Sequence, residues 1–422
     1  MRFIGSASPG VILWAAIAAG ATSVAAAEAP VRLADVVAEA RARNPEIAAA
    51  RARADAAAAR PPQARAWEDP VVTWEAWNAP ESFDVARADN NIVRVGQKLP
   101  FPGKLTLMGR MAARDADMAA RDADAVALDV VTAVKHAYWD LWRRRRTVAI
   151  VERDRDLVDR YARIALEKYT VGEAAQSDVL RAQVELAHQV NRLTTETLGA
   201  DGARAELNAL LSRPPDAPLG PLEEPPAPRV PPRTDGLIAR ALAARPELVG
   251  QAAVIARARE AVRLARLEYL PDFELSVGRF INVRGRDGVG AMASVTVPLP
   301  NKAKYDAGRA EAAAALAAAE AELRRLQDRV RREVEQAYLR AQAARTEHDL
   351  FATTHVPHAE QALRASETGY RTGKVDFLSL VDSVRAVQMV HLEHVRASAD
   401  FETAWADLER AVGAELARDG GE

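Results

Sequence analysis

The stretch Tyr169-Thr170-Val171-Gly172 returns as Tyr370-Arg371-Thr372-Gly373, 201 residues later in the chain. The stretch Asn44-Pro45-Glu46-Ile47 returns as Arg245-Pro246-Glu247-Leu248 at the same offset of 201 residues. Landmarks that keep both their order and their offset indicate an internal duplication, and a duplicated unit decides the fold of the whole chain.

Two further landmarks fit the same duplication. Pro70 returns as Pro271, again 201 residues later. Leu99-Pro100-Phe101-Pro102-Gly103-Lys104 matches Val297-Pro298-Leu299-Pro300-Asn301-Lys302 at an offset of 198 residues. The second copy is therefore three residues shorter before this point and recovers them in the segment that follows.

A proline-crowded segment, residues 213–233, separates the two copies. Proline has a fixed φ and no backbone N–H, so such a segment cannot continue a helix or a central strand, and we predict an extended connector. The predicted organisation is a first repeat over 28–212, this connector, a second repeat over 234–416 and a C-terminal tail over 417–422.

Residues 1–27 read as a secretory signal peptide. Arg2 precedes an apolar run from Val11 to Ala21, and small residues end at Ala27, where we expect cleavage. A membrane anchor is the alternative, but the apolar run is shorter than the ~20 residues that a spanning helix needs. The chain has no cysteine, which excludes disulfides and a lipidated N-terminal cysteine, so we expect an exported protein that is not lipidated.

The sequence pattern changes in the same order within each repeat. Ala-rich stretches with helical spacing come first, over Leu33–Arg60 and Leu237–Glu268, with helix starts at the prolines 45 and 246. Runs of about ten residues follow, bounded by Pro, Gly and Asn and rich in Val, Trp, Phe, Thr and Ser. We predict these runs as strands: Asp69–Asn78, Asn91–Pro100, Asp272–Asn282 and Val289–Pro298.

Long segments nearly free of helix breakers follow the strands, at Lys104–Lys168 and Lys302–Gly369. Their apolar residues recur in steps of three and four, which is typical of a coiled-coil seam. At 1.5 Å per residue the second helix would be ~100 Å long, with a kink at Pro357. Each long helix then ends at a turn, and returning helices follow over Val179–Leu211 and Leu378–Leu416.

A single chain with this pattern can neither cover its helix seams nor pair all of its strand edges. A helical hairpin ~100 Å long needs neighbours to cover its seam. Four strands of spanning length cannot close a barrel, and an open sheet edge cannot lie in lipid. Three copies would supply twelve strands and a ring of helices. We therefore predict a mainly α fold with a small β part: tandem long helical hairpins forming a trimeric α-barrel, completed by a 12-stranded trimeric transmembrane β-barrel.

The duplicated N-P-E-I and R-P-E-L starts, the P-F-P-G-K strand exit and the paired Y-x-x-G turns together resemble the TolC-type outer-membrane efflux proteins. The P-F-P-G-K stretch is also similar to the branch that exports heavy metals with resistance-nodulation-division pumps. The resemblance implies a homotrimeric duct in the outer membrane of a Gram-negative bacterium that extends into the periplasm. It also implies contact with outer-membrane lipid, a periplasmic adaptor and an inner-membrane pump, and passage of substrate, with metal ions among the candidates, without chemical change.

The resemblance assigns the tip of the duct to the two turns. Tyr169, Gly172, Tyr370 and Gly373 would form the periplasmic tip at which the adaptor docks. A purely structural alternative accounts for the two glycines equally well, because glycine in the left-handed conformation is the usual C-cap of a helix.

Three residues match the gate of the family. Asp178 would bond to Tyr370 and help to close the tip, and Asp382 would ring the narrow aperture. The alternative for Asp178 is a solvated carboxylate favoured at a helix start. The chain departs from the family at Ser379, where a second carboxylate is expected, and at Val375, where an arginine is expected, so the second gate bond is open to question.

The histidines do not define a metal site. His391 and His394 are spaced i, i+3, and His355 and His358 flank Pro357. Without cysteine or a third ligand fixed by spacing, polar seam or surface histidines are the better interpretation. We predict no metal site and no cofactor.

The remaining features exclude other classes of function. A formal charge of −2, with both signs interspersed, gives no basic patch for nucleic acid. No Ser-His-Asp set, phosphate loop or carboxylate pair at catalytic spacing appears, so we expect no enzyme. A soluble periplasmic coiled-coil scaffold or adaptor protein is the competing interpretation. Trp74, Trp77, Phe273 and Phe280 lie on the predicted strands, where either aromatic girdles or ordinary packing would place them.

Overall fold

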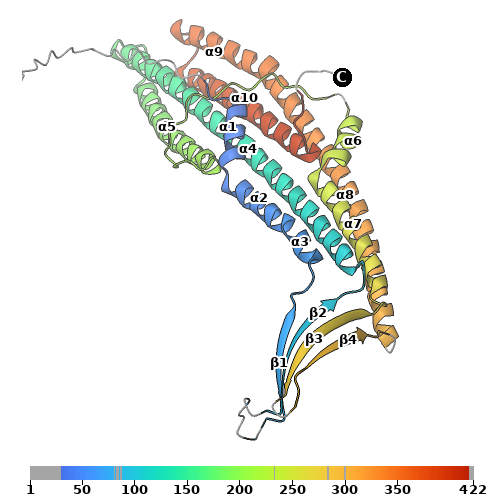
Figure 1. Cartoon of the computed structure of the whole chain (residues 1–422). Coiled ribbons are helices and arrows are strands. Elements are labelled where there is room, and N and C mark those ends of the chain that lie inside the picture. The colour runs from blue at the N-terminus through green and yellow to red at the C-terminus, as the bar shows by residue number, and fades with distance from the viewer. Residues whose placement is uncertain are drawn as a thin grey trace, which may run out of the picture.

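The computed structural model describes residues 30–79, 81, 85, 88–231, 233–282, 285–298 and 301–417. The expected signal peptide over 1–27 and all but the first residue of the expected tail lie outside these residues. The described chain is a long bundle of helices with a small sheet at one end (Figure 1). The mainly α fold with a small β part is therefore confirmed.

Short helices open each repeat. In the first repeat they are α1 (Leu33–Arg43), α2 (Pro45–Ala58) and α3 (Arg60–Arg65), and in the second they are α6 (Asp235–Ala244) and α7 (Pro246–Leu267). The predicted single stretches are each divided just before a proline. The residue preceding a proline is disfavoured in helical backbone, and Asn44 has ψ 125° while its side chain accepts from the N–H of Glu46 at 2.9 Å, capping α2. The predicted helix starts at the prolines are confirmed.

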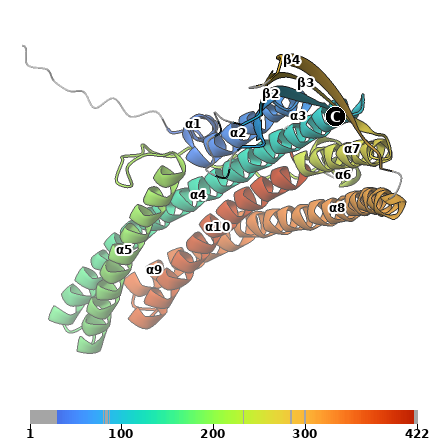
Figure 2. The ribbon, with the colours of Figure 1, turned by 60° about the horizontal axis from the view of Figure 1, so that its bottom comes forward.

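The long hairpins are present as predicted. The first consists of α4 (Lys104–Thr170) and α5 (Gln176–Leu210), and the second of α8 (Lys302–Leu350), the π-helix η3 (Phe351–His355), α9 (Val356–Arg371) and α10 (Phe377–Val412). With 67 residues, α4 is ~100 Å long. The two hairpins lie side by side and end far from the sheet (Figures 1 and 2).

The second long helix changes its hydrogen bonding directly before Pro357. A proline inside an α-helix removes one N–H and pushes its ring against the carbonyl four residues earlier. The π-helical turn η3 accommodates the proline ring, and it ends two residues before Pro357. The predicted kink at this proline stays a prediction, whereas the change to π-helical hydrogen bonding before it is observed.

The sheet has four antiparallel strands in the order β1 (Val71–Trp77), β2 (Asn90–Leu99), β3 (Asp272–Asn282) and β4 (Gly288–Thr296). Every residue of β2 pairs with a residue of β3, and this pairing joins the first repeat to the second. Strands β1 and β4 occupy the two edges, and neither has a second strand beside it among the described residues.

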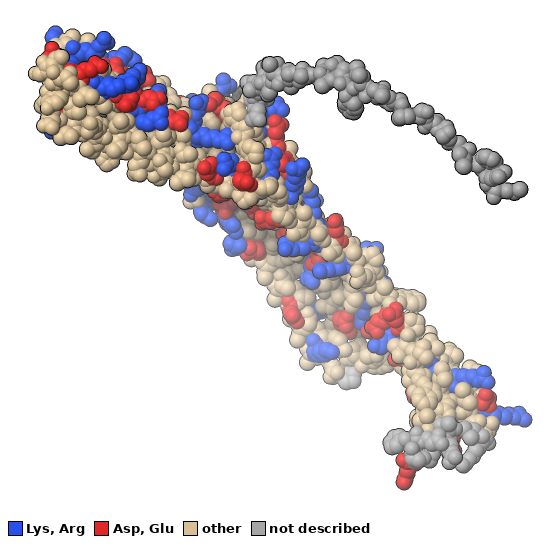
Figure 3. Space-filling model, turned by 90° about the vertical axis from the view of Figure 1, so that its left-hand side faces the viewer, with Lys and Arg blue, Asp and Glu red and all other residues tan. Residues whose placement is uncertain are grey.

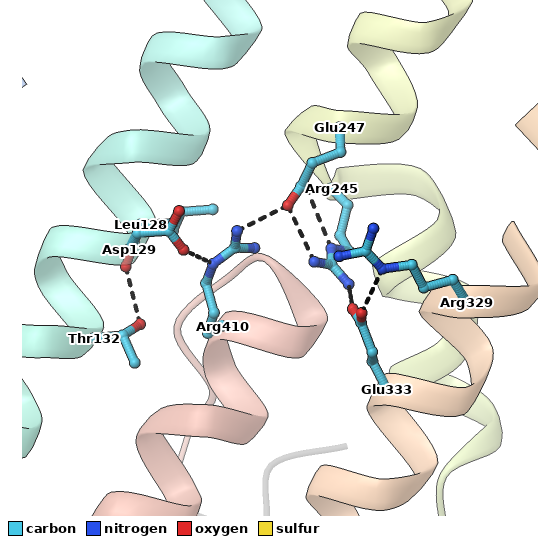
Figure 4. A network of polar contacts seen from close by, with 8 residues as sticks. All are labelled: Leu128, Asp129, Thr132, Arg245, Glu247, Arg329, Glu333 and Arg410. Atoms are coloured by element: carbon cyan, nitrogen blue, oxygen red, sulfur yellow. Dashed lines mark hydrogen bonds and ion pairs between the residues drawn. The ribbon is translucent and has the colours of Figure 1, made fainter. Parts of the chain in front are cut away.

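A charged network joins helices of both repeats (Figure 4). Arg410 of α10 donates to Asp129 of α4 and, at 2.8 Å, to Glu247 of α7. Arg245 also bonds Glu247, at 3.1 Å, and pairs with Glu333 of α8. The side chain of Arg245 is only 7% exposed, so these carboxylates compensate a buried charge.

The surface away from this network carries both signs of charge. On the face seen in Figure 3, Lys and Arg side chains are interspersed with Asp and Glu along the bundle. Among the residues that the structure describes, no helix is both long and apolar enough to cross a membrane.

Candidate functional site

The strand register sorts the side chains of the sheet onto two faces, because residues paired across antiparallel strands point to the same side. One face, here called the apolar face, carries mostly aliphatic and aromatic residues: Val72, Trp74, Ala76, Val93, Val95, Leu99, Phe273, Leu275, Val277, Ile281, Val289, Ala291, Ala293 and Val295. Its polar members are Asn91, Gln97 and Arg279. Side chains on this face are exposed, up to 79% at Val289, so the single chain leaves it uncovered.

The opposite side, here called the polar face, carries mostly charged, hydroxyl and amide groups: Thr73, Glu75, Asn90, Arg94, Lys98, Asp272, Glu274, Ser276, Asn282, Ser294 and Thr296. Its apolar members are Val71, Trp77, Ile92, Phe280 and Met292. Arg94 and Glu75 form an ion pair at 3.2 Å on this face. The sheet is thus amphipathic, with one side suited to an apolar medium and the other to water.

The aromatic residues on the strands divide between these faces. Trp74 and Phe273 lie on the apolar face, whereas Trp77 and Phe280 lie on the polar face. Phe280 covers Gly290, where an added Cβ would come within 2.5 Å of its ring. Phe280 therefore has a packing role, filling the space that the glycine leaves.

The P-F-P-G-K stretch forms a junction between the repeats. Gly103 has φ +100° at the start of α4, a conformation that glycine adopts without strain. The Lys104 side chain, 4% exposed, places Nζ 2.9 Å from Asp272 and 3.6 Å from Glu268. Asp272 also accepts the N–H of Phe101 at 2.7 Å. The motif thus anchors the exit of β2 to the start of β3.

The two Y-x-x-G turns form matching helix ends. Gly172 and Gly373 have φ +81° and +72°. The N–H groups of Glu173 and Lys374 each bond the carbonyl five residues earlier at 2.8 Å, which is the Schellman pattern of helix termination. Among the described residues no atom lies within 4 Å of a Cβ built on either glycine, so both turns face open space.

The two turn tyrosines have different environments although their sequence positions match. Tyr169 is 42% exposed, while Tyr370 is 6% exposed and lies in a core that joins both hairpins. Lys168 reaches across from α4, placing Nζ 4.8 Å from the centre of the Tyr370 ring and 3.1 Å from its carbonyl oxygen. The first tyrosine is thus partly exposed at its turn, and the second packs in the core between the two hairpins.

Of the three expected gate residues, Asp178 and Tyr370 lie close enough for the charge of Asp178 to act on the Tyr370 hydroxyl, without a hydrogen bond between them. Burial, and then the charge of Asp178, raise the pKa of Tyr370. The Tyr370 hydroxyl has no hydrogen-bond partner within the described part of the chain. Asp382 is exposed and lies 3.8 Å from Arg385. Of the two departures from the family, Val375 packs against the glycine at 369, and the Ser379 N–H bonds the N-cap carboxylate of α10.

A polar cluster that sequence reasoning missed joins the hairpins between α5 and α10. Arg385 donates from Nε to Glu185 at 3.1 Å, and Glu185 is 6% exposed at its side chain. Gln388 and Gln189 exchange hydrogen bonds at 2.9 and 3.3 Å. Burial would raise the pKa of the Glu185 carboxyl, but hydrogen bonds from Arg385 and Gln189 outweigh it and hold the pKa below its ordinary value.

The signal for this cluster was present in the sequence. Glu185 and Gln189 are spaced i, i+4, and Arg385 and Gln388 are spaced i, i+3, so each pair lies on one side of its helix. Polar residues at seam positions of two helices are candidates to face each other. Which residues pair depends on how the two hairpins dock. The spacing of residues within one helix does not give this information.

The histidines are distributed over separate contacts. His391 has a partner at each ring nitrogen, Arg153 at 2.6 Å and Glu360 at 3.1 Å. The ring of His394 packs instead on His348 of α8. In the described ranges, no group of three or more His, Cys, Asp or Glu residues is arranged to hold a metal ion.

Solved structures with a similar fold are outer-membrane channels. The outer-membrane channel OprN is 19% identical, with a TM-score of 0.78 over 91% of this chain and 90% of that chain. The channel CusC is 14% identical, with a TM-score of 0.75 over 91% and 92% of the two chains. The fold is that of the TolC-type outer-membrane channels, as the sequence resemblance implies.

The family follows from the sequence comparison. The family model described as "Outer membrane efflux protein" matches residues 36–213 and again 237–414, and this chain belongs to that family. A curated relative, the cobalt-zinc-cadmium resistance protein CzcC of Cupriavidus metallidurans, is 22% identical over 294 residues, 68% of each chain.

Proposed function

We propose that three copies of this chain form the exit duct of a tripartite efflux system in the outer membrane of a Gram-negative bacterium. The observation that carries the proposal is the amphipathic sheet. Its exposed apolar face would meet lipid, and its polar face would line a water-filled passage. A soluble coiled-coil scaffold, the competing interpretation, has no use for this uncovered apolar face.

Trimer formation would give hydrogen-bond partners to the backbone groups at the two edges of the sheet. A strand edge with free N–H and C=O groups is costly in lipid, so β1 and β4 both need partners there. Because the order is β1-β2-β3-β4 and all pairs are antiparallel, β4 of one copy would run antiparallel to β1 of the next. Three sheets would then close a barrel in which all neighbouring strands are antiparallel.

The hairpins would extend the passage into the periplasm. At ~100 Å, α4 carries the turns far from the sheet. Exposed Tyr169 and Val171 would offer apolar contact area to a periplasmic adaptor, with Gly172 and Gly373 setting the two turns. The inner-membrane pump would act through that adaptor. The division into two repeats and a connector is part of the same proposal.

The closed state would be held by contacts between the hairpins. Asp178 and Tyr370 remain part of the proposed gate through packing and charge, and Asp382 would lie at the aperture. Arg385 connects this carboxylate to Glu185, so it would transmit closure from one hairpin to the other.

Metal ions are the proposed cargo. The support is the curated relative, whose name assigns it to cobalt, zinc and cadmium resistance. The duct would pass them without catalysis and without a bound cofactor, and the pump partner would select them.

Disulfide trapping tests the barrel directly because the chain has no native cysteine. Val72→Cys on β1 would be combined in turn with Val289→Cys, Ala291→Cys, Ala293→Cys or Val295→Cys on β4, all on the apolar face. One of these pairs should give covalent dimers and trimers in isolated outer membranes. Val72→Cys with Met292→Cys, which places the thiols on opposite faces, is the matched control. Absence of linked species from every same-face pair would overturn the proposal.

A further inference from the structure

Two imidazole rings from different helices meet inside the second hairpin. His348 of α8 and His394 of α10 have ring centroids 5.2 Å apart, with planes inclined at 43°. Their positions are 46 residues apart, so spacing within one helix could not reveal the pair.

The His394 ring has an unused nitrogen. Its Nε2 atom is buried and has no hydrogen-bond partner in the described part of the chain. A neutral imidazole nitrogen that has no hydrogen-bond partner can bind a metal ion through its lone pair.

The His348 ring is oriented by a carboxylate. Its Nδ1 lies 3.3 Å from Oδ1 of Asp349, to which Nδ1–H can donate a hydrogen bond, and this leaves the Nε2 lone pair available. A carboxylate behind an imidazole is the usual second partner of a metal-binding histidine. The side chain is 18% exposed, so an ion from solution can reach it.

We propose that His348 and His394 bind one divalent transition-metal ion of the zinc class, each through Nε2, with water completing the coordination. Two imidazoles on one zinc ion, with Zn–N distances of about 2.0–2.1 Å, have ring centres about 5–6 Å apart. The observed separation falls in this range. With two protein ligands the site is weaker than a structural zinc site, which has four.

This site would be part of the helical wall and does not depend on the proposed cargo. A bound ion would link α8 to α10 just before the π-helical turn η3, where regular helical hydrogen bonding is interrupted. Metal binding would therefore stiffen the second hairpin at this point.

The chain supplies a matched control one helical turn away. His391 shares α10 with His394, but both of its ring nitrogens are occupied, by Arg153 and Glu360. Replacing it should leave the pair of free nitrogens intact.

The test is titration of the full-length, detergent-solubilised protein, without a polyhistidine tag, with Co²⁺ followed by its visible absorption and with Zn²⁺ in competition. The parent should bind about one ion per chain, and His348→Ala or His394→Ala should each weaken binding about tenfold or more, while His391→Ala stays close to the parent. Excess Mg²⁺, which prefers oxygen ligands, should not compete. Melting curves without metal check that each variant is folded. Unchanged binding in both ligand variants, or equal loss in His391→Ala, would overturn the assignment.

Discussion

Arg385 of α10 and Glu185 of α5 join the two helical hairpins through two hydrogen bonds to one carboxylate oxygen. The carboxylate is buried, whereas the arginine side chain is 54% exposed. Opening of the tip by separation of these hairpins would have to break this contact. We therefore expect the contact between Arg385 and Glu185 to stabilise the closed state.

Replacing Arg385 with Ala should favour the open state. A hydrogen bond to a charged group contributes roughly 1.5–3 kcal/mol, and exposure of the arginine reduces this to about 1 kcal/mol per copy. Over three copies that open together, this is about 3 kcal/mol, so the open–closed equilibrium should shift about a hundredfold. Single-channel conductance in planar bilayers and sensitivity of cells to large antibiotics should both rise.

Tyr370→Phe is the matched comparison, because it removes a hydroxyl without a partner in the described chain and keeps the ring. It should change conductance less than Arg385→Ala. If Asp178→Ala combined with Tyr370→Phe opens the channel further than Arg385→Ala does, closure depends on the phenol–carboxylate pair instead.

Gly172→Val and Gly373→Val should impair docking more than folding. A non-glycine residue in left-handed backbone costs about 1–2 kcal/mol, and no neighbouring atom obstructs the new side chain at either site. Export should fall while the amount of assembled protein in the outer membrane stays normal. Asn tolerates this conformation better, so Gly→Asn variants separate backbone strain from added bulk. Loss of assembly in the Val variants would make these glycines structural only.

Glu247 should stabilise the fold in a pH-dependent manner. Burial opposes ionisation, but bonds from Arg245 and Arg410 lower the pKa of Glu247 from 4.5 to about 2. A depressed pKa gives stability that is complete above the ordinary pKa and is lost as pH falls from about 4.5 to 2. Glu247→Gln should lower the free energy of unfolding by ~3 kcal/mol at pH 7. Denaturant unfolding should show this difference shrinking below pH 4.5; a constant difference would refute the electrostatic account.

Ionised Asp154 should lower the stability of the fold, whereas ionised Glu247 should raise it. Its side chain is 4% exposed, one carboxylate oxygen has no partner in the described residues, and burial raises its pKa. The destabilising cost of the charge is therefore present above the raised pKa and disappears as pH falls to the ordinary carboxyl range. Asp154→Asn should raise the melting temperature at pH 8, with a smaller gain in acid. A lower melting temperature at pH 8 would show that the carboxylate makes a net favourable contact.

Much of the fold was predictable from local pattern. The repeated Y-x-x-G turns locate both helix reversals, because a Schellman end needs glycine at one position. Pro45 and Pro246 locate helix starts. Pro357 marks an irregular part of the second long helix, but its π-helical form was not predicted. These features depend on backbone rules that act within a few residues, so the sequence contains them directly.

Contacts between distant segments were not predictable in this way. The division of the strands into an apolar and a polar face depends on the pairing of β2 with β3, which lie in different repeats. The contact of Arg385 with Glu185 likewise requires two helices 200 residues apart to dock in one register. Periodicity places each side chain on a helix face but does not say which residue it meets.

The mass of the detergent-solubilised protein tests the central claim most directly, because the proposed duct requires three chains to close its barrel. Native mass spectrometry of protein extracted from outer membranes should give three times the mass of the mature chain, with Val72→Cys and its cross-linking partner converting this species to a covalent trimer. A monomer that retains its β-sheet signal in lipid would contradict the account.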